Sequence, residues 1–360
     1  MSKAELLKRF DAVIGRPLVP LVRRLAGGRR GMPTDVPEVL FIRPGGIGDA
    51  VLLLPGISHV KRAFPGASID VLCEGRNAGV FAMTTAVSRT YLYDRGIDLL
   101  RCLGNRYDVV IDTEQWHRLS GIVAAGTQAP IRLGFDTNNR GTLFTHKVAY
   151  SHDEYEAVSF ANLIAPLTEQ PLTFDHNAPF ITLVEDIPGE LSLSAGELNR
   201  VVSVFPGASV RERRWGGRNY GKVAGALSDM GYIPVIVGAG SDKADAVEIS
   251  RHCDRCIDLT GKTTLVQSAS VLKLSRVLIS ADSGLLHIAV GVGTPTVSLF
   301  GSGIQGKWAP PGKAHRVINA GLSCSPCTRF GYTHPCKIGV ECLTSITPEK
   351  VTEAALQVLE

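Results

Sequence analysis

The stretch FIRPGGIGDAVLLLP, residues 41–55, decides the fold, because a short apolar run enters a glycine-rich turn and an apolar helix pattern follows. Similar β-rich runs alternate with helical patterns along the chain. Strands are expected in VLFIR, SIDVLCE, VVIDTE and IRLGF of the first half, and in VVSVFPG, YIPVIVGAG, VLISAD and TPTVSLFG of the second. Such alternation builds parallel sheets with right-handed crossovers. We therefore predict an α/β protein of two doubly wound, Rossmann-like domains facing a central cleft, where ligands bind.

The domain organisation follows from where this alternation starts and breaks. It starts near residue 37, and prolines and acidic residues interrupt it around 175–199. The predicted parts are a basic amphipathic extension (1–36), a first domain (37–180), a linker (181–200), a second domain (201–347) with a cysteine-rich loop (322–343), and a C-terminal helix (348–360).

Charge is concentrated at the N-terminus. The 360 residues have a formal net charge of +4, and residues 1–30 hold eight Lys and Arg against two acidic residues. The remainder is slightly acidic, which argues against a nucleic-acid partner. The extension lacks the roughly 18-residue apolar run of a membrane span and a signal-peptide pattern. It suits an anionic membrane surface, or it packs on the protein itself.

The first glycine turn departs from a dinucleotide-binding motif. Gly46 and Gly48 are present, but Asp49 follows and the third glycine is missing. A helix N-terminus favours an ionised Asp49, and the glycines admit a substrate hydroxyl, so Asp49 is a candidate general base. The alternatives are a simple helix cap, and an NAD-dependent oxidoreductase in which Glu74 binds the ribose.

An anion site is predicted in the second half of the chain. In LISADSGLLHIAVGVGTPTVSLFG, 278–301, a strand ends before Asp282-Ser283-Gly284, and a helix begins with His287 one turn in. Amides at a helix N-terminus suit a diphosphate. The cluster RERRW, 211–215, offers arginines for phosphate or leaving-group charge. The alternatives are a buried structural histidine and a solvated arginine loop.

Five segments, in order, resemble glycosyltransferase family 9, the heptosyltransferase family of lipopolysaccharide core assembly: RPGGIGDAVLLLPGISHVKRAFPGASIDVL, FPGASVRERRW, GYIPVIVGAGSD, DLTGKTTL and ADSGLLHIAVGVGTPTVSLFG. The resemblance covers roughly residues 38–350 and implies a GT-B fold, an ADP-heptose donor, and metal-free inversion at the anomeric carbon. Asp49 matches the family's proposed base. Arg213 stands where the family often has lysine, which keeps the charge but alters the geometry.

The resemblance and the turn chemistry together give a set of site residues. The predicted catalytic residues are Asp49 and Arg213. The predicted donor-binding residues are Gly207, Arg214, Lys262, Asp282, Ser283, Gly284, Leu285 and His287. The predicted acceptor-side residues are Gly46, Gly48, Asp112, Glu114, His117 and Arg118, although ordinary loop polarity explains the last four about as well.

Four cysteines near the C-terminus have metal-ligand spacing: Cys324, Cys327, Cys336 and Cys342. Such thiolates can hold a structural zinc or iron; free or pairwise-oxidised thiols are the alternative. A related arrangement in the autotransporter heptosyltransferase branch resembles an iron-holding finger linked to oligomer formation. Cys253 and Cys256 are interpreted as a helix end, and no disulfide framework is expected in a reducing cytoplasm.

These observations predict an inverting, metal-independent glycosyltransferase that moves heptose from ADP-heptose to a hydroxyl of a lipopolysaccharide core lipid or of a protein. No cofactor is expected for catalysis. The expected location is the cytoplasm, with peripheral contact at the cytoplasmic face of the bacterial inner membrane, and a homo-oligomer is considered. The alternatives are the NAD-dependent oxidoreductase and a non-catalytic sugar-nucleotide-binding protein.

Overall fold

The computed structural model describes residues 11–25, 31, 36–168, 172, 175, 178–186, 191–329 and 332–360. Parts of the predicted N-terminal extension and linker, and two residues of the predicted cysteine-rich loop, lie outside the described residues. The chain divides into two compact units, Met1–Phe174 and Asp175–Glu360. Residues 178–186 therefore belong to the second unit, where the N–H groups of Phe180 and Ile181 donate to the Gly291 carbonyl at 2.8 and 2.9 Å.

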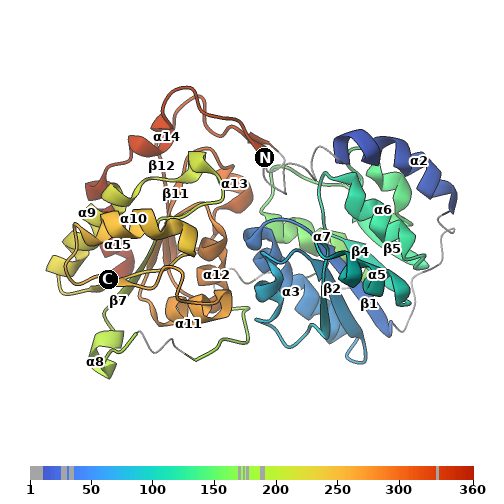
Figure 1. Ribbon diagram of the computed structural model, residues 1–360, viewed down its shortest axis with the longest axis horizontal. Helices are drawn as coiled ribbons and strands as arrows, with labels where there is room; N and C mark the ends of the chain where they lie inside the picture. The colour runs from blue at the N-terminus through green and yellow to red at the C-terminus, as the bar shows by residue number, and fades with distance from the viewer. Residues whose placement is uncertain are drawn as a thin grey trace. The chain divides into compact units, whose positions relative to one another are not determined.

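The N-terminal unit contains a six-stranded parallel sheet in the order β3-β2-β1-β4-β5-β6 (Figure 1). The chain enters at the centre, extends the sheet to one side, and returns to extend it to the other. Its elements are η1 (Asp11–Gly15), α2 (Arg16–Leu25), β1 (Glu38–Arg43), α3 (Ile47–Ala63), β2 (Ser68–Cys73), α4 (Ala78–Phe81), β3 (Arg89–Leu92), α5 (Gly96–Gly104), β4 (Val109–Asp112), α6 (Arg118–Gly126), β5 (Ile131–Phe135), η2 (Arg140–Leu143), β6 (His146–Val148) and α7 (Glu156–Thr168).

Strand β1 is fully buried from Val39 to Ile42, as expected for the central strand of a parallel sheet covered on both faces. Ile42 belongs to a buried cluster that includes Cys102 of α5 and Ala124 of α6, so these helices cover one face. The right-handed crossover through α3, from β1 to β2, runs in the opposite direction and places α3 on the other face. Helix α7 packs against α3 on that face.

The C-terminal unit repeats this plan with the parallel order β12-β11-β10-β7-β8-β9. A short antiparallel pair, β13 and β14, is added after it. Its elements are α8 (Ala195–Leu198), β7 (Val201–Phe205), η3 (Arg211–Arg213), α9 (Gly217–Asp229), β8 (Ile233–Ile236), η4 (Gly240–Asp242), α10 (Lys243–Ser250), β9 (Ile257–Asp258), α11 (Leu265–Leu274), β10 (Leu278–Ala281), α12 (Gly284–Val292), β11 (Thr296–Phe300), α13 (Gln305–Trp308), β12 (His315–Asn319), β13 (Thr328–Arg329), β14 (Tyr332–Thr333), α14 (Glu341–Thr344) and α15 (Pro348–Leu359).

The core of this unit joins the sheet to its C-terminal helix. Helix α15 packs against α9, β11 and β12, and its Val351 and Leu359 belong to the same buried cluster as Val204 and Leu299 of the sheet. The indole N–H of Trp215 donates to the Ile346 carbonyl at 3.0 Å. The chain after β12 is thus part of the C-terminal unit's core.

The prediction of two doubly wound α/β sheets is confirmed. Each of the eight predicted strand segments contains a strand, namely β1, β2, β4, β5, β7, β8, β10 and β11. The strands β3, β6, β9 and β12 were not predicted. They are the four edge strands of the two sheets and are only partly buried, so they lack the continuous apolar run of the central strands.

The described part of the N-terminal extension packs on its own unit. Val19 of α2 lies in a buried cluster with Ala125 of α6 and Leu143 of η2. The carboxylate of Asp11, 3% exposed, accepts hydrogen bonds from the N–H groups of Arg118 and Leu119, at 2.6 and 2.8 Å, where α6 begins. Among the described helices, none combines the length and the apolar character required to cross a membrane.

Candidate active site

Both sheets carry their predicted site turns at the carboxyl ends of central strands. The direction of strand addition reverses between β1 and β4 in one unit and between β7 and β10 in the other. Doubly wound sheets bind ligands at this reversal point. The turns after β1 (44–49) and β10 (282–287) therefore lie where binding sites are expected.

In the N-terminal unit the glycine turn brings Asp49 into the first turn of α3. Gly45 has φ +105°, a left-handed conformation that favours glycine, and its N–H donates to Glu74 Oε1 at 3.1 Å. Gly46 is the N-cap and Gly48 lies in the first turn of α3. The Asp49 side chain is 23% exposed. Glu74 therefore holds the glycine turn in place. In the oxidoreductase alternative it would instead bind the ribose of NAD.

Arg43, which the sequence analysis missed, lies beneath this turn. Its side chain is 2% exposed, with Nη2 3.8 Å from Asp49 Oδ2 and 3.4 Å from Glu114 Oε2. Nε donates to the Pro44 carbonyl at 2.8 Å and Nη1 to the Thr113 carbonyl at 2.9 Å. Burial lowers the pKa of Arg43, but the two carboxylates raise it, and the net shift is upward. The arginine therefore stays charged and links the two strand-end turns.

Two of the predicted acceptor-side residues, Asp112 and Glu114, make contacts within the protein at the end of β4 and in the loop that follows. Asp112 and Arg140 are both 0% exposed and form an ion pair; burial raises the pKa of Asp112, and Arg140 opposes this shift. Glu114 Oε1 accepts from the N–H groups of Gln115 and Trp116 at 3.1 and 3.0 Å. Burial raises the pKa of Glu114, but Arg43 and other cations lower it, and the net shift is downward. Both carboxylates shape the loop from within.

The remaining two predicted acceptor-side residues reach the surface. His117 is 32% exposed and Arg118 12% exposed, at the start of α6. Both approach Asp11, with His117 Nδ1 at 3.7 Å and Arg118 Nη1 at 3.8 Å from its Oδ2. Sequence reasoning missed Asp11 because it lies more than 100 residues away from the turn that it supports.

In the C-terminal unit, the capped N-terminus of helix α12 follows β10. Ser283 is the N-cap of α12, and its Oγ accepts from the Leu286 N–H at 3.3 Å. Gly284 is the first helical residue, and the Leu285 side chain is 7% exposed. The first N–H groups of an α-helix have no intrahelical acceptor and attract anions. The turn thus has the backbone that the sequence analysis predicted for a diphosphate site.

An arginine and an aspartate meet in front of this helix. Arg213 Nη1 lies 2.9 Å from Asp282 Oδ2, with the side chains 15% and 6% exposed. Within the described part of the chain, Arg213 Nε and His287 Nδ1 are buried without a hydrogen-bond partner, and Asp282 Oδ2 has its ion pair with Arg213 but no hydrogen bond. Buried polar atoms are normally satisfied, so the two nitrogens together mark a place where a ligand can supply partners. A Cβ on Gly303 would overlap the Asp282 carboxylate.

His287 is a neutral member of this cluster. The side chain is 2% exposed. Burial lowers its pKa to about 4, Asp282 opposes the shift and Arg213 adds to it. At neutral pH the imidazole therefore offers one donor and one acceptor and no charge.

The structure separates the roles of the neighbouring arginines 213 and 214. Arg214 donates from Nε to the Ala208 carbonyl at 3.1 Å, from Nη1 to Asp245 at 3.2 Å and from Nη2 to Asp242 at 3.0 Å. Gly207 packs so close to Asp242 that a Cβ on Gly207 would be 2.6 Å from the Asp242 carboxyl. Arg214 therefore holds the turn after β7. Lys262 is exposed in the turn after β9.

The segment after β11 contributes two contacts to Arg213 that sequence reasoning missed. The guanidinium lies 6.0 Å from the Trp308 ring centroid, and Nη2 lies 3.5 Å from Thr328 Oγ1. Glu212 Oε1 accepts from the Cys336 N–H at 3.3 Å. The cysteine-rich loop therefore packs beside the turn that carries Arg213.

The predicted metal site is not supported. Cys342 is buried, Cys327 is half-buried, and Cys324 and Cys336 are exposed. Burial raises the pKa of Cys327 and Cys342, and the neighbouring thiols raise it further. Within the described residues, which include all four thiols, no group of three or more His, Cys, Asp and Glu side chains is arranged to hold a metal ion.

A disulfide elsewhere corrects the sequence analysis. Cys253 and Cys256, interpreted as part of a helix end, are joined by a disulfide after α10. The tight turn there brings their Cα atoms to 5.6 Å, within the range that a disulfide requires. Spacing alone did not reveal this turn.

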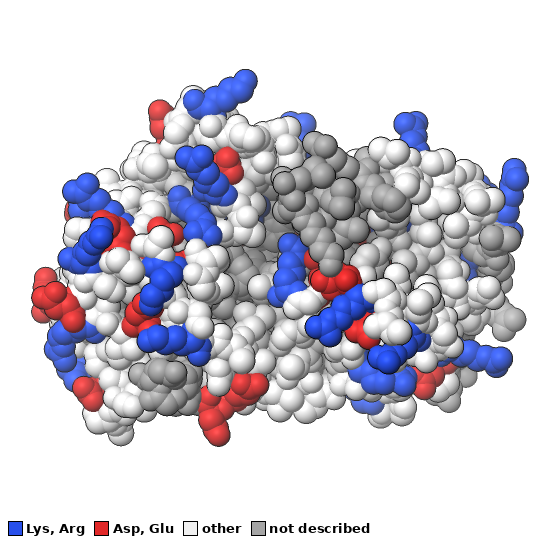
Figure 2. All heavy atoms as spheres, in the orientation of Figure 1, with Lys and Arg blue, Asp and Glu red and all other residues white. Residues whose placement is uncertain are grey.

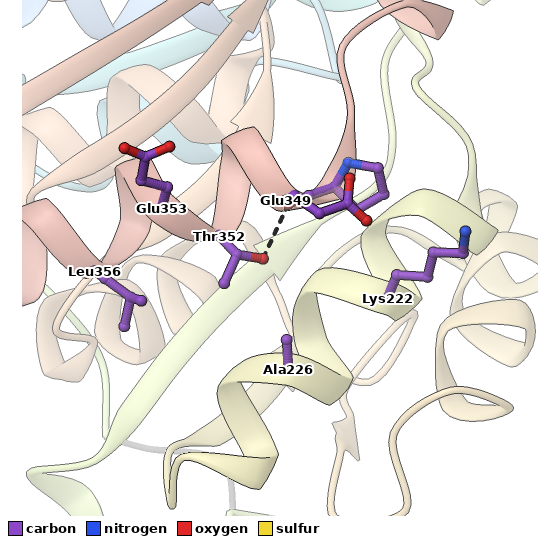
Figure 3. Close-up of a pocket in the computed structure, with 7 residues that line it drawn as sticks. Lys222, Ala226, Glu349, Thr352, Glu353 and Leu356 are labelled. Carbon is purple, nitrogen blue, oxygen red and sulfur yellow. Dashed lines mark hydrogen bonds between the residues drawn. The ribbon is translucent and has the colours of Figure 1, made fainter.

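A cavity of about 350 Å³ lies between α9 and α15, lined by Lys222, Ala226, Pro348, Glu349, Thr352, Glu353 and Leu356 (Figure 3). The Thr352 hydroxyl donates to the Pro348 carbonyl at 2.9 Å. None of the lining residues belongs to the cluster around Arg213, and the charges are those of ordinary helix surfaces. We assign no chemistry to this cavity.

Comparison with known proteins identifies the family. The model of glycosyltransferase family 9 (heptosyltransferase) matches residues 97–337, more than half of the chain. The chain is 24% identical over 307 residues to lipooligosaccharide heptosyltransferase 2 of Haemophilus ducreyi, an alignment that covers 78% of this chain and 88% of that protein.

Solved structures share the fold. A glycosyltransferase family 9 protein of Veillonella parvula matches with a TM-score of 0.75 at 18% identity, covering 92% of this chain and 99% of that chain. The E. coli heptosyltransferase WaaC with ADP-2-deoxy-2-fluoro heptose matches with a TM-score of 0.70 at 16% identity, covering 89% and 99%.

The autotransporter branch is a structural neighbour only. The iron-containing dodecameric glycosyltransferase TibC of enterotoxigenic E. coli matches with a TM-score of 0.55 at 15% identity, covering 91% of this chain and 77% of that chain. This likeness concerns the fold and does not place the chain in that branch. The family match also removes the oxidoreductase alternative. The chain belongs to glycosyltransferase family 9 (heptosyltransferase) and is a glycosyltransferase with the GT-B fold.

Proposed function

We propose that this glycosyltransferase moves heptose from ADP-heptose to a hydroxyl of the lipopolysaccharide core, with inversion at the anomeric carbon. The donor assignment rests on the cluster of Arg213, Asp282 and His287 at the N-terminus of α12, in which two buried nitrogens, Arg213 Nε and His287 Nδ1, have no hydrogen-bond partner. The names of the relatives supply the sugar and the acceptor class.

On the donor side, the helix start and Arg213 stabilise the departing ADP. As the anomeric C–O bond breaks, its electron pair goes to the diphosphate oxygen. The N–H groups at the start of α12 and the Arg213 guanidinium offset this charge where it develops. Asp282 orients Arg213 through their ion pair, and neutral His287 adds a hydrogen bond without a competing charge.

On the acceptor side, Asp49 acts as the general base. It takes the proton of the attacking hydroxyl while the new C–O bond forms on the face opposite the departing ADP, which inverts the anomeric centre. The glycines before Asp49 leave space for the acceptor. His117 and Arg118 are placed to bind acidic groups of the core, and Asp112, Glu114 and Arg43 hold their loops in position.

A lipid-linked acceptor is proposed in preference to a protein acceptor. The relatives with similar sequences are lipooligosaccharide and lipopolysaccharide heptosyltransferases, whose names indicate a lipid-linked acceptor. The proposal includes peripheral contact with the cytoplasmic face of the inner membrane, where such a lipid would be met. The homo-oligomer stays a prediction that sedimentation velocity would test.

The decisive experiment compares Asp49→Asn with Arg213→Gln. We expect Asp49→Asn to lower the rate of heptose transfer by a factor of about 10² to 10⁴, the usual contribution of a general base, with ADP stabilisation of the fold unchanged. Arg213→Gln should lower both transfer and ADP stabilisation. If Asp49→Asn transfers heptose at the original rate, the base assignment is wrong. If UDP or GDP stabilises the protein and ADP does not, the donor assignment is wrong.

A further inference from the structure

Glu156 is a buried carboxylate of the N-terminal unit that the proposed reaction does not use. Many acidic side chains lie at the surface of the protein, and Figure 2 shows those of one face in red beside basic side chains in blue. Glu156 is instead the first residue of α7 and is 0% exposed. A buried charge is unfavourable unless other groups satisfy it. The partners of Glu156 therefore show which segments the residue holds together.

The two oxygens of Glu156 accept hydrogen bonds from two different segments. Gln115, in the loop after β4, donates from Nε2 to Oε1. Tyr150, between β6 and α7, donates from its hydroxyl to Oε2 at 2.9 Å. The Tyr150 ring also packs edge-on against Phe135, the last residue of β5, with the ring centroids 4.9 Å apart. Glu156 thus joins the start of α7 to the loop after β4 and, through Tyr150, to the end of β5.

The loop that Glu156 contacts, residues 113–118, is called the acceptor loop here. Its backbone is held from two other directions. The Gln115 N–H donates to Glu114 Oε1 at 3.1 Å, and the Gln115 carbonyl accepts from the Thr137 hydroxyl. The Trp116 carbonyl accepts from Asn138 Nδ2 at 2.9 Å. Among these contacts, the one to Glu156 fixes the Gln115 side chain.

The acceptor loop ends with His117 and Arg118, the two residues proposed to bind acidic groups of the acceptor. It is also connected to the turn that carries Asp49, because Glu114 and Asp49 both approach Arg43, at 3.4 and 3.8 Å. Glu156 acts on the same arginine. Burial lowers the pKa of Arg43, and Asp49, Glu114 and Glu156 raise it, in that order. The start of α7, the acceptor loop and the Asp49 turn therefore meet in one buried polar network.

We propose that Glu156 is a positioning residue for the acceptor. It holds Gln115 and Tyr150 at the same time, and so fixes the acceptor loop relative to the turn that carries Asp49. The inference rests on the proposed function, which places the acceptor on the N-terminal unit. A loop that is ordered before binding costs its ligand less conformational entropy. Loss of Glu156 should therefore weaken binding of the acceptor and spare binding of the donor.

Steady-state kinetics of the full chain tests the proposal, with ADP-heptose and a delipidated, water-soluble lipopolysaccharide core acceptor as substrates. Glu156→Ala removes both hydrogen bonds. We expect the KM for the acceptor to rise about tenfold or more, since a hydrogen bond to a charged group contributes roughly that factor. The KM for ADP-heptose should not change, and kcat should change much less than the acceptor KM, as for an interaction that contributes equally to ground-state and transition-state binding. Glu156→Gln keeps one accepting oxygen and should recover part of the loss.

The matched control is Glu154→Gln, which removes the same charge two residues earlier in the chain. Glu154 accepts hydrogen bonds from Ser159 at 2.9 Å and from Asn162 at 3.2 Å, both on α7. No contact between Glu154 and the acceptor loop is recorded in the described part of the chain. We expect this variant to keep both KM values.

Two milder variants decide the question if Glu156→Ala folds poorly. Tyr150→Phe removes only the hydroxyl, and Gln115→Met removes only the amide. Each should raise the acceptor KM by a factor of about three or more. Hydrogen exchange gives a readout that does not depend on activity, because the N–H groups of residues 115–117 should exchange faster in Gln115→Met than in Glu154→Gln.

Three outcomes would overturn the inference. The first is an unchanged acceptor KM in folded Glu156→Ala, or in both milder variants. The second is an equal rise in the KM for ADP-heptose, and the third is the same rise in Glu154→Gln. These outcomes leave the proposed function in place, since that function is tested by Asp49→Asn. If Asp49→Asn keeps the original rate while Glu156→Ala raises the acceptor KM alone, the base assignment fails and the positioning role stands.

Discussion

Arg43 is the residue whose position in the site was least evident from sequence. The segment FIRPGG, residues 41–46, is typical of a strand end. Nothing in it shows that the arginine turns inward toward Asp49 and Glu114. Its buried guanidinium is held by carbonyl and carboxylate partners and lies 5.8 Å from the centroid of the Phe160 ring. It therefore acts as a positioning residue for Asp49.

Substitution of Arg43 should affect turnover more than donor binding. In Arg43→Met the two carboxylates lose their shared cation, so Asp49 is no longer held, and we expect kcat to fall at least tenfold. Arg43→Lys keeps the charge with fewer donors and should recover part of the loss. Steady-state kinetics and ADP melting shifts check this. An unchanged kcat in Arg43→Met, in protein that melts normally, would contradict it.

His287 should make stability pH-dependent below neutrality. Its pKa is about 4 in the folded protein, against about 6.5 in an unfolded chain. Between these values the unfolded state binds more protons, so the folded state loses stability as the pH falls from about 6.5 toward 4. The loss approaches about 3 kcal/mol at about 1.4 kcal/mol per pKa unit.

The measurement is urea unfolding of the unchanged protein and His287→Gln from pH 7 to 4.5. The variant should lose less stability over this range. His315 has its pKa lowered to about 4 as well, so it contributes in both proteins and cancels in the difference. Parallel stability curves would show that burial of His287 carries no such cost.

At the scale of elements, Asp11 shows how a distant segment completes a helix. Its carboxylate takes two N–H groups of α6, a capping role that sequence neighbours usually fill. Asp11→Ala should lower the free energy of unfolding by about 1 to 2 kcal/mol, whereas Asp11→Asn should lose less because its amide oxygen still accepts. Thermal unfolding compares the two. Equal stability of all three proteins would show that α6 does not depend on this cap.

The central strands and both site turns could be predicted because local sequence determines them. Runs such as VVSVF are buried on both sides, and glycine or Asp-Ser-Gly chemistry marks where they end. The edge strands, such as HKV with its exposed lysine, carry no such pattern. The sequence analysis predicts that Asp112 contacts the acceptor and that Arg214 contacts the donor, because both are polar residues at or after a strand end. Their partners, Arg140, Asp242 and Asp245, lie 28 or more residues away, and only the folded chain shows that they are already satisfied.

At the scale of the whole molecule, the two units have the same strand order and different chemistry. Both reverse at a central strand pair, which creates a binding position in each. The N-terminal unit places an aspartate on its first helix turn, which disfavours a diphosphate there. The C-terminal unit also has an aspartate at the equivalent position, but Asp282 is paired with Arg213 at 2.9 Å, in front of a serine-capped helix start. In the function that we propose, the two copies of this topology therefore take different roles, proton removal in the N-terminal unit and diphosphate binding in the C-terminal unit.

If the diphosphate binds to the C-terminal unit, ADP should protect the backbone of that unit from hydrogen exchange. Saturating ADP should slow exchange in 206–215 and 282–303, because these segments form the cluster around Arg213. At 100 times its dissociation constant ADP adds about 2.7 kcal/mol to stability, which suffices to slow amides that exchange by local opening. The glycine turn at 44–49 should exchange at its ligand-free rate. The variant Asp282→Asn weakens the ion pair that orients Arg213 and should reduce the protection. Protection centred on 44–49 would instead place the nucleotide at the N-terminus of α3 and reverse the assignment of the two units.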